Sequence, residues 1–248
     1  MPAPDEDAPY ALLSPDECAR RRALLAALPS MRPLAEFVQA LRLRHGPACV
    51  IPDFDPCDGG TEARALFLLE APGPRARVSG FASRNNPDQT ARNLCGLMGA
   101  AGIARTDTLL WNIVPWYVGT SSRIRPVTPQ DIAEAQAALR GLLALLPRLA
   151  LIVLVGRKAQ SARPFLQTLT PVPIMVTYHM SPQVFNISPA LEAADAERLS
   201  RHRPRSAKRL IRIGLVSAWA PVFPRREAVI YSPVPGVWCL RPGRVPGV

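Results

Sequence analysis

The sequence predicts an α/β protein, a three-layer α/β/α sandwich with a central, mainly parallel four-stranded sheet. Short apolar runs alternate along the chain with longer segments of helical periodicity, which is the order of a parallel sheet joined by helices. The apolar runs are almost uninterrupted, as in strands that are covered on both faces. Right-handed crossovers between such strands place helices on both sides of the sheet.

Two helices are expected before the first strand. Ser14 supplies an N-cap, Pro15 stands at the first helical position, and Glu17 is placed to close a capping box. The first helix should therefore run to about Leu28. A second helix is expected over 34–44.

The four predicted strands are short and apolar, and turn residues bound them. They cover 65–69, 108–114, 149–155 and 173–178. Three further helices are expected between these strands, each after a cap or turn signal. They begin after Asp88, Thr128 and Gly156, and they extend to about Gly102, Leu146 and Leu169.

One domain is expected, because 248 residues with 48% hydrophobic content can bury one substantial core. Residues 1–13 resemble a disordered acidic lead-in, and residues 14–220 are assigned to the domain. The segment 198–212 holds seven Lys or Arg residues and no acid, and it should lead into a helix through Trp219. The Pro- and Gly-rich tail, 221–248, is expected to lack regular structure.

No membrane span or signal peptide is visible, so a cytoplasmic protein is expected, and we expect a monomer. The five cysteines include no C-x-x-C pair. That pattern argues against a disulfide framework and against a standard zinc or iron-sulfur site, so no metal or cofactor is expected.

The net charge of +11 is unevenly distributed. Residues 1–62 carry 10 acids and 6 bases, which sum to −4, whereas the remainder carries 9 acids and 24 bases, which sum to +15. A basic body attracts phosphate polymers such as DNA. The alternative is compositional, since only Lys158 and Lys208 are lysines and the chain is rich in Arg, Ala and Pro.

Three predicted strands end on polar residues, namely Glu70, Asn112 and His179. In an open parallel sheet, ligands bind outside the carboxyl ends of the strands, so these three side chains should converge on one crevice. An amide both donates to a carbonyl oxygen and accepts from a ring N–H of a pyrimidine. An imidazole donates to negative charge on a leaving base.

Each of these residues also has an ordinary structural interpretation. Glu70 would cap nearby amides, Asn112 would hold its own loop in place, and His179 would be a satisfied structural histidine. No one of the three segments decides between the interpretations alone.

Taken in order, the three segments LEAPG, LLWNIVPW and HMSPQ resemble the motifs of the uracil-DNA glycosylase superfamily. The resemblance spans about 66–183 and is nearest to the branch with a G-E-A-P-G motif. It implies that Asn112 reads the uracil edge, that His179 stabilises the departing base, and that Glu70 lies nearest the attacking water. It also implies that Phe81 stacks on uracil, although simple core packing is the alternative for that ring.

The remaining implied contacts fall into two groups. The turn of the first motif would complete the base pocket through Ala71, Pro72 and Gly73. Contacts to DNA would come from Arg123, Arg125, Ser181 and Pro182, unless the arginines are only solvated surface charges.

Several residues depart from the family pattern. Leu69 replaces the first glycine of the G-E-A-P-G motif, Ala71 stands where another branch has a catalytic Asp, and Met180 replaces a proline. The branch has a further acid after its glycine, where this chain reads Pro74-Arg75-Ala76. The iron-sulfur cysteines of the branch are missing as well.

The leading hypothesis is a DNA repair glycosylase that flips uracil or a related deaminated base out of DNA and hydrolyses its N-glycosidic bond. A second hypothesis is a catalytically inactive glycosylase-fold protein that binds nucleic acid. A third is another doubly wound hydrolase acting on a nucleoside or nucleotide, against which the chain has no G-x-x-x-x-G-K-[ST] or G-x-G-x-x-G loop.

Overall fold

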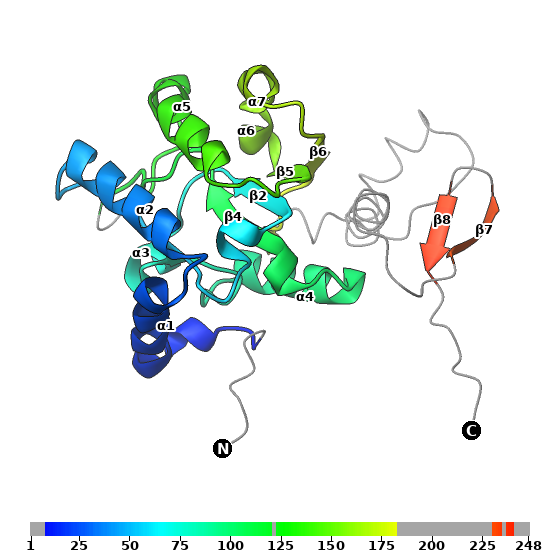
Figure 1. Cartoon of the computed structure of the whole chain (residues 1–248), viewed down its shortest axis with the longest axis horizontal. Coiled ribbons are helices and arrows are strands. Elements are labelled where there is room, and N and C mark those ends of the chain that lie inside the picture. Colours follow the sequence, from blue (N-terminus) through cyan, green and yellow to red (C-terminus); the bar gives the residue numbers. More distant parts are fainter. Residues whose placement is uncertain (1–7, 121–122, 183–229, 235–236, 241–248) are drawn as a thin grey trace.

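A parallel four-stranded sheet forms the centre of the protein (Figure 1). The computed structural model describes residues 8–120, 123–182, 230–234 and 237–240. The strands lie in the order β4-β2-β5-β6, and every neighbouring pair is parallel. Their bounds are β2 (Ala65–Leu69), β4 (Thr108–Asn112), β5 (Leu151–Val155) and β6 (Ile174–Thr177). The predicted fold class is therefore confirmed.

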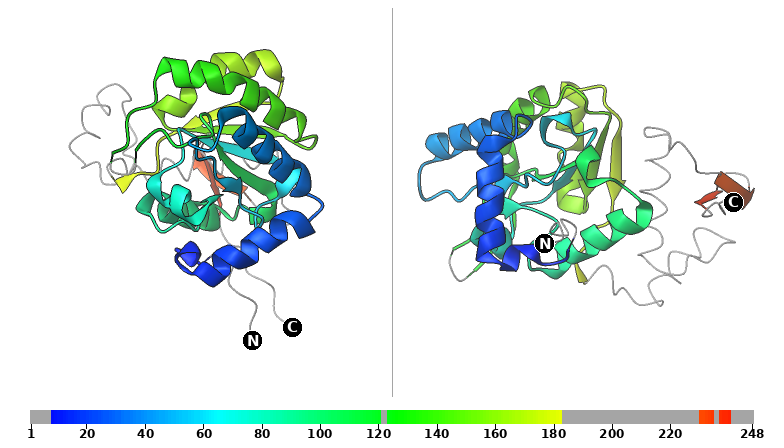
Figure 2. Two further views of the ribbon diagram at one scale, coloured as in Figure 1. Left: turned by 90° about the vertical axis from the view of Figure 1, so that its left-hand side faces the viewer. Right: turned by 60° about the horizontal axis from the view of Figure 1, so that its bottom comes forward.

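Helices cover both faces of this sheet. Successive residues of a strand point to opposite sides of the sheet, so each strand contributes to two apolar cores. In β2, Leu66 belongs to one apolar core and Phe67 to another. The first core is shared with α2 (Arg32–His45) and α5 (Pro129–Ala144), and the second with α4 (Gln89–Ala101). In Figures 1 and 2, α5 and α4 lie on opposite sides of the strands.

The helices begin where the capping residues predict. Ser14 accepts from the Glu17 backbone N–H at the start of α1 (Pro15–Ala27), and Asp88 accepts from the N–H of Ala91 in α4. Thr128 forms a complete capping box at the start of α5. The capping box expected for Glu17 does not form, because its carboxylate pairs with arginines of α1.

The observed structure differs from the predicted one mainly in its short elements. The helix expected over 157–169 is two helices, α6 (Arg157–Gln160) and α7 (Arg163–Leu169), because Pro164 has no N–H with which to continue the first one. Several elements were too short to give a periodic pattern. They are α3 (Pro74–Ser79), β1 (Asp53–Phe54), β3 (Phe81–Ala82), η2 (Gly60–Glu62) and η3 (Arg105–Asp107). The strands β1 and β3 pair with each other in parallel.

Residues 8–13, assigned to a disordered lead-in, are ordered against the domain. They include η1 (Ala11–Leu13), in which Leu12 is buried. The N–H of Leu12 donates to the Asn85 carbonyl at 3.3 Å, and the Asn85 side chain donates to the Ala8 carbonyl at 2.8 Å. One apolar side chain and two hydrogen bonds thus hold a segment whose composition alone indicated disorder.

The tail also differs from expectation, because β7 (Ile230–Val234) and β8 (Val237–Leu240) pair antiparallel. The basic segment 198–212, the helix expected through Trp219 and the domain boundary near 220 lie outside the described residues. Within the described ranges, no helix combines the length and apolar character needed to cross a membrane.

Candidate active site

A pocket of about 500 Å³ opens at the carboxyl ends of the strands. Glu70 follows β2, Asn112 ends β4, His179 follows β6, and all three line this pocket. The register of the sheet explains part of the convergence, since Leu69 pairs with Asn112 and accepts from the Ile113 N–H at 2.8 Å. The three strand ends therefore meet in one crevice, as the topology of the sheet predicts.

Asn112 brings an uncommitted amide to the pocket. The residue is 6% exposed, and no hydrogen bond joins its amide to any residue in the described part of the chain. Both the oxygen and the NH₂ group of the amide are therefore available to a ligand. The interpretation that Asn112 holds its own loop finds no bond to support it.

The imidazole of His179 is held in a defined tautomer. Its Nδ1 accepts from the backbone N–H of Ser181 at 3.1 Å, so Nε2 carries the proton of the neutral ring. Burial lowers the pKa of His179, against the opposing attraction of Glu70 and Asp88. The neutral ring thus presents an N–H donor to the pocket at physiological pH.

Gly156, which directly follows β5, makes room for this imidazole. It has a φ of +87°, and a Cβ built there would lie 3.0 Å from both Cβ and Cδ2 of His179. Such contacts are too close without movement of the ring or of the backbone. Gly156 is thus required twice, by its own backbone conformation and by the histidine beside it.

For the base release that the motifs predict, we expect Gly156→Ala to reduce the rate about 10-fold. The His179 ring must shift by a few tenths of an ångström, and a full misplacement of about 1 Å costs about 100-fold. Single-turnover kinetics on an oligonucleotide substrate measure this rate. Gly46→Ala is the matched control, since Gly46 has a φ of +80° and nothing within 4 Å of the added Cβ. Both variants should lose about 1–3 kcal/mol of stability, and equal loss of activity in both would contradict the contact with His179.

The turn of the first motif contributes the wall next to Glu70. Ala71, Pro72 and Gly73 all line the pocket, and a Cβ at Gly73 would meet nothing within 4 Å. The N–H of Val114 donates to the Glu70 carbonyl at 3.1 Å, which ties this turn to the segment after β4. The three residues of this turn that were predicted to bind the base are therefore present in the pocket wall.

Phe81 is the exception among the residues predicted to bind the base. It lies in β3, its side chain is 0% exposed, and it belongs to the apolar core and not to the pocket lining. Its neighbour Ala82 reaches the pocket instead. The structure thus places Phe81 as a packing residue, which was the alternative interpretation of this ring.

The residues predicted to bind DNA lie in different settings. Arg125 lines the pocket, but its guanidinium forms two hydrogen bonds of 2.6 and 2.7 Å with Asp131. That contact holds the pKa of Asp131 well below its usual value. Arg123 is exposed on the same loop, whereas Ser181 and Pro182 are half-buried next to His179 and do not line the pocket.

Sequence reasoning missed five polar residues of the pocket wall. Asp88, Ser83 and Asn86 come from the segment before α4, Thr90 comes from α4, and Arg75 comes from α3. Asp88 was recognised only as a helix cap, and nothing in the local pattern showed that it faces a ligand site. Within the described ranges, no group of three or more His, Cys, Asp or Glu side chains is arranged to hold a metal ion.

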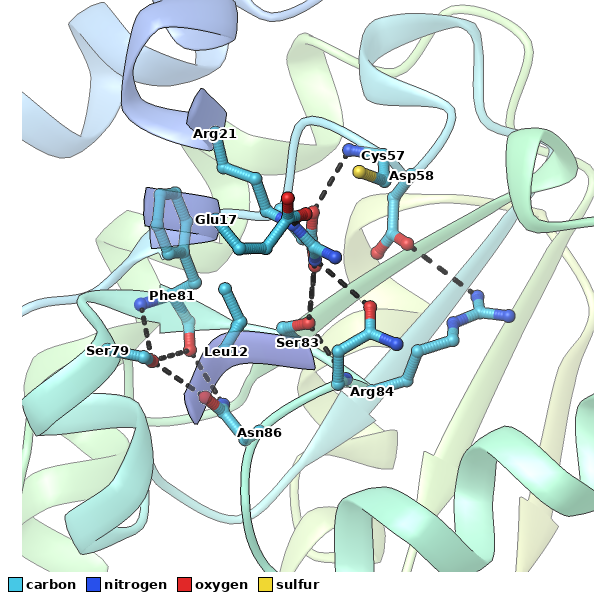
Figure 3. A network of polar contacts seen from close by, with 12 residues as sticks. Leu12, Glu17, Arg21, Cys57, Asp58, Ser79, Phe81, Ser83, Arg84 and Asn86 are labelled. Carbon is cyan, nitrogen blue, oxygen red and sulfur yellow. Dashed lines mark hydrogen bonds and ion pairs between the residues drawn. The ribbon is translucent and has the colours of Figure 1, made fainter. Parts of the chain in front are cut away.

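A buried ionic network fixes the segment before α4 from behind (Figure 3). Asp55, with a side chain 0% exposed, pairs with Arg21 of α1 and with Arg105 at 2.7 Å, and it accepts from Ser83. Asn85 accepts from Arg105 at 2.6 Å and from Arg21 at 3.0 Å. The position of this wall of the pocket therefore depends on a helix that precedes the first strand.

The same network perturbs two carboxyl groups in opposite directions. Burial acts to raise the pKa of Asp55, but the attraction of Arg105 and Arg21 outweighs it, and the pKa lies below its usual value. Burial raises the pKa of Asp58 to about 6, although Arg105 and Arg84 oppose it. Arg105 is thus a partner of both acids, but the arginines outweigh the effect of burial only at Asp55.

Two comparisons bear on the identity of this fold and pocket. The family model of the uracil DNA glycosylase superfamily matches residues 56–199, which include all three strand ends that line the pocket. A search of curated proteins found no match. Because the family model covers more than half of the chain, the protein belongs to the uracil-DNA glycosylase superfamily.

Proposed function

We propose that this protein is a DNA glycosylase that hydrolyses the N-glycosidic bond of uracil or of a related deaminated base in DNA. The single observation that carries the proposal is the uncommitted amide of Asn112 in the same pocket as the N–H donor of His179. Membership in the superfamily supports a glycosylase reaction. The pocket chemistry supports a base with a carbonyl oxygen beside a ring N–H.

The amide of Asn112 suits the edge of uracil. Its NH₂ group donates to O4 of the base and its carbonyl accepts from N3–H, so both polar groups are satisfied at once. Cytosine presents an amino group and a bare ring nitrogen at these positions, which leaves mismatched groups inside a buried site. Such unpaired groups give strong discrimination, whereas simple differences of size do not.

The reaction separates charge, and the pocket holds a group for each sign. The bond between C1′ and the base nitrogen breaks with its electron pair leaving on the base, while water adds to C1′. The Nε2–H of His179 donates to the oxygen of the departing anion. The carboxylate of Glu70 favours the oxocarbenium character of the sugar.

The base reaches this pocket only after it leaves the helical stack, which costs a few kcal/mol. Phosphate contacts offset that cost, and exposed arginines are available for them near the pocket. Arg75 lines the pocket, and Arg77 and Arg123 are exposed on α3 and on the loop before α5. Arg125 is less available because Asp131 already binds it.

Release of the base from a uracil-containing oligonucleotide tests the proposal. Purified protein should convert single- or double-stranded substrate into an abasic product that alkali cleaves, whereas a thymine-containing oligonucleotide stays intact. Hypoxanthine-containing substrates show whether related deaminated bases are accepted. Salt-sensitive binding of DNA without any abasic product would contradict the proposal and would instead favour a binding protein with the glycosylase fold.

Asn112→Asp is expected to weaken discrimination between uracil and cytosine. A carboxylate no longer donates to O4 of uracil, and it accepts from the amino group of cytosine. The rate on uracil should fall at least about 100-fold, and the ratio of rates on cytosine and uracil should rise. Gln167→Glu makes the same amide-to-carboxylate change on the exposed face of α7 and should leave both rates unaltered. An unchanged ratio in Asn112→Asp would refute the reading role.

A further inference from the structure

We propose that Asp88 is a second catalytic carboxylate of this site and accepts the proton of the attacking water. The inference rests on the proposed glycosylase function and assigns a residue of that pocket to the water. Asp88 lines the pocket at the start of α4, with Thr90, Ala91 and Leu94 of the same helix beside it. It comes 15 residues after Gly73, outside all three motifs that indicated the function.

Asp88 and Glu70 act on the same imidazole. The negative charges of both residues act on His179 from within the pocket. Two carboxylates therefore lie near the group that supports the departing base. The first motif supplies one of them, and the turn before α4 supplies the other.

The two carboxylates differ in how firmly they are held. Oδ1 of Asp88 accepts from the Ala91 N–H at 2.9 Å, and the Thr90 amide acts on the same carboxylate. The Glu70 side chain has no hydrogen bond with the described part of the chain. A general base acts best from a fixed position within reach of the water, which favours the shorter, capped side chain.

Hydrogen bonds hold the turn that carries Asp88. Asn86 accepts from the Ser79 hydroxyl at 2.7 Å and donates to the Phe81 carbonyl at 2.8 Å (Figure 3). The Asn86 carbonyl accepts from the Asp88 N–H at 2.8 Å. Asp88 is therefore held, through Asn86, by hydrogen bonds to Ser79 and Phe81.

The environment of Asp88 increases its basicity. Burial raises its pKa, while the Ala91 and Thr90 amides, Arg75 of α3 and His179 oppose that rise. A carboxylate with a raised pKa is a stronger proton acceptor than an ordinary surface aspartate.

The step balances with these groups alone. The water oxygen forms its bond to C1′ while the bond from C1′ to the base nitrogen breaks, and that electron pair leaves with the base. The proton released by the water passes to the carboxylate of Asp88. The base departs as an anion that the Nε2–H of His179 stabilises.

Variants that keep the helix cap isolate the carboxylate. Asn and Ser cap helices as well as Asp does, so Asp88→Asn and Asp88→Ser remove the charge and retain the fold of α4. Single-turnover base release should fall about 100- to 1,000-fold in both, with melting temperatures close to wild type. Asp16→Asn, an exposed carboxylate in the first turn of α1, is the control and should keep the full rate.

The pH profile separates a proton acceptor from a structural cap. The wild-type rate should fall at acid pH as Asp88 is protonated, Asp88→Asn should lose this acid limb, and Glu70→Gln should keep it. Rates within threefold of wild type in both cap-retaining variants would overturn the assignment, as would an unchanged acid limb. Wild-type protein that releases no base from any oligonucleotide would overturn the proposed function itself, and this inference with it.

Discussion

Asp55→Asn should lower the free energy of unfolding by about 3–5 kcal/mol, the loss typical of breaking a buried ion pair from one side. The amide has nearly the same shape as the carboxylate, so the change removes charge without opening a cavity. Arg21, 0% exposed, and Arg105, 7% exposed, then remain buried without their shared anion. Urea denaturation followed by circular dichroism measures the loss.

The matched control is Glu62→Gln, the same chemical change in the Arg148–Glu62 pair at the surface. The side chains of Arg148 and Glu62 are 61% and 56% exposed, and Nη1 of Arg148 lies 2.9 Å from Oε2 of Glu62. Exposed pairs contribute at most about 1 kcal/mol, so this variant should stay close to wild type. Similar losses of stability in the two variants would mean that burial does not increase the contribution of the ion pairs.

The pH dependence of stability follows from the same network. The folded-state pKa of Asp55 lies below its usual value, so its contribution is present above the unfolded pKa and is lost as the pH falls. The contribution of Asp58 to stability changes with pH in the opposite direction, because its pKa rises from 3.8 to about 6 in the folded protein. The folded state then binds the Asp58 proton more tightly than the unfolded chain does, so the stability from this group decreases as the pH rises from about 4 to about 6.

The sheet and the three strand ends were predictable from local sequence. A run such as Ala65–Leu69 is apolar throughout because both of its faces are covered, and the register of a parallel sheet brings the ends of such runs to one edge. The caps at Ser14, Asp88 and Thr128 were predictable for the same reason, since a cap depends on residues within one turn.

The wall of the pocket was not predictable in this way. Asp88 faces the pocket because Asn85 and Ser83 are fixed by Arg21, Asp55 and Arg105, which lie 20 to 64 residues away from them in the chain. No periodicity or spacing reports such contacts. A phenylalanine that packs in the core and one that stacks on a ligand likewise look the same in a sequence. The position of Phe81 in the core is therefore known only from the structure.

His179→Ala is expected to reduce the rate of base release about 100- to 1,000-fold, as removal of one donor to a developing oxyanion does. The methyl group leaves the departing base without the N–H that Nε2 presents, since Nδ1 is committed to Ser181. The loss should appear in the chemical step and leave the binding of DNA nearly unchanged. Single-turnover rates and equilibrium binding, measured on the same oligonucleotide, separate the two effects.

The pH profile decides which form of His179 acts. Because burial lowers its pKa, the ring is neutral at physiological pH, so the contribution of His179 should be constant from about pH 7 upward. An imidazolium donor would instead lose its effect as the pH rises through the lowered pKa of His179, and a decline there that His179→Ala abolishes would contradict the neutral donor. His45→Ala is the control, because that ring packs 4.6 Å from Trp116 and does not line the pocket. Its rate and pH profile should match wild type, which would tie the loss in His179→Ala to the imidazole in the pocket.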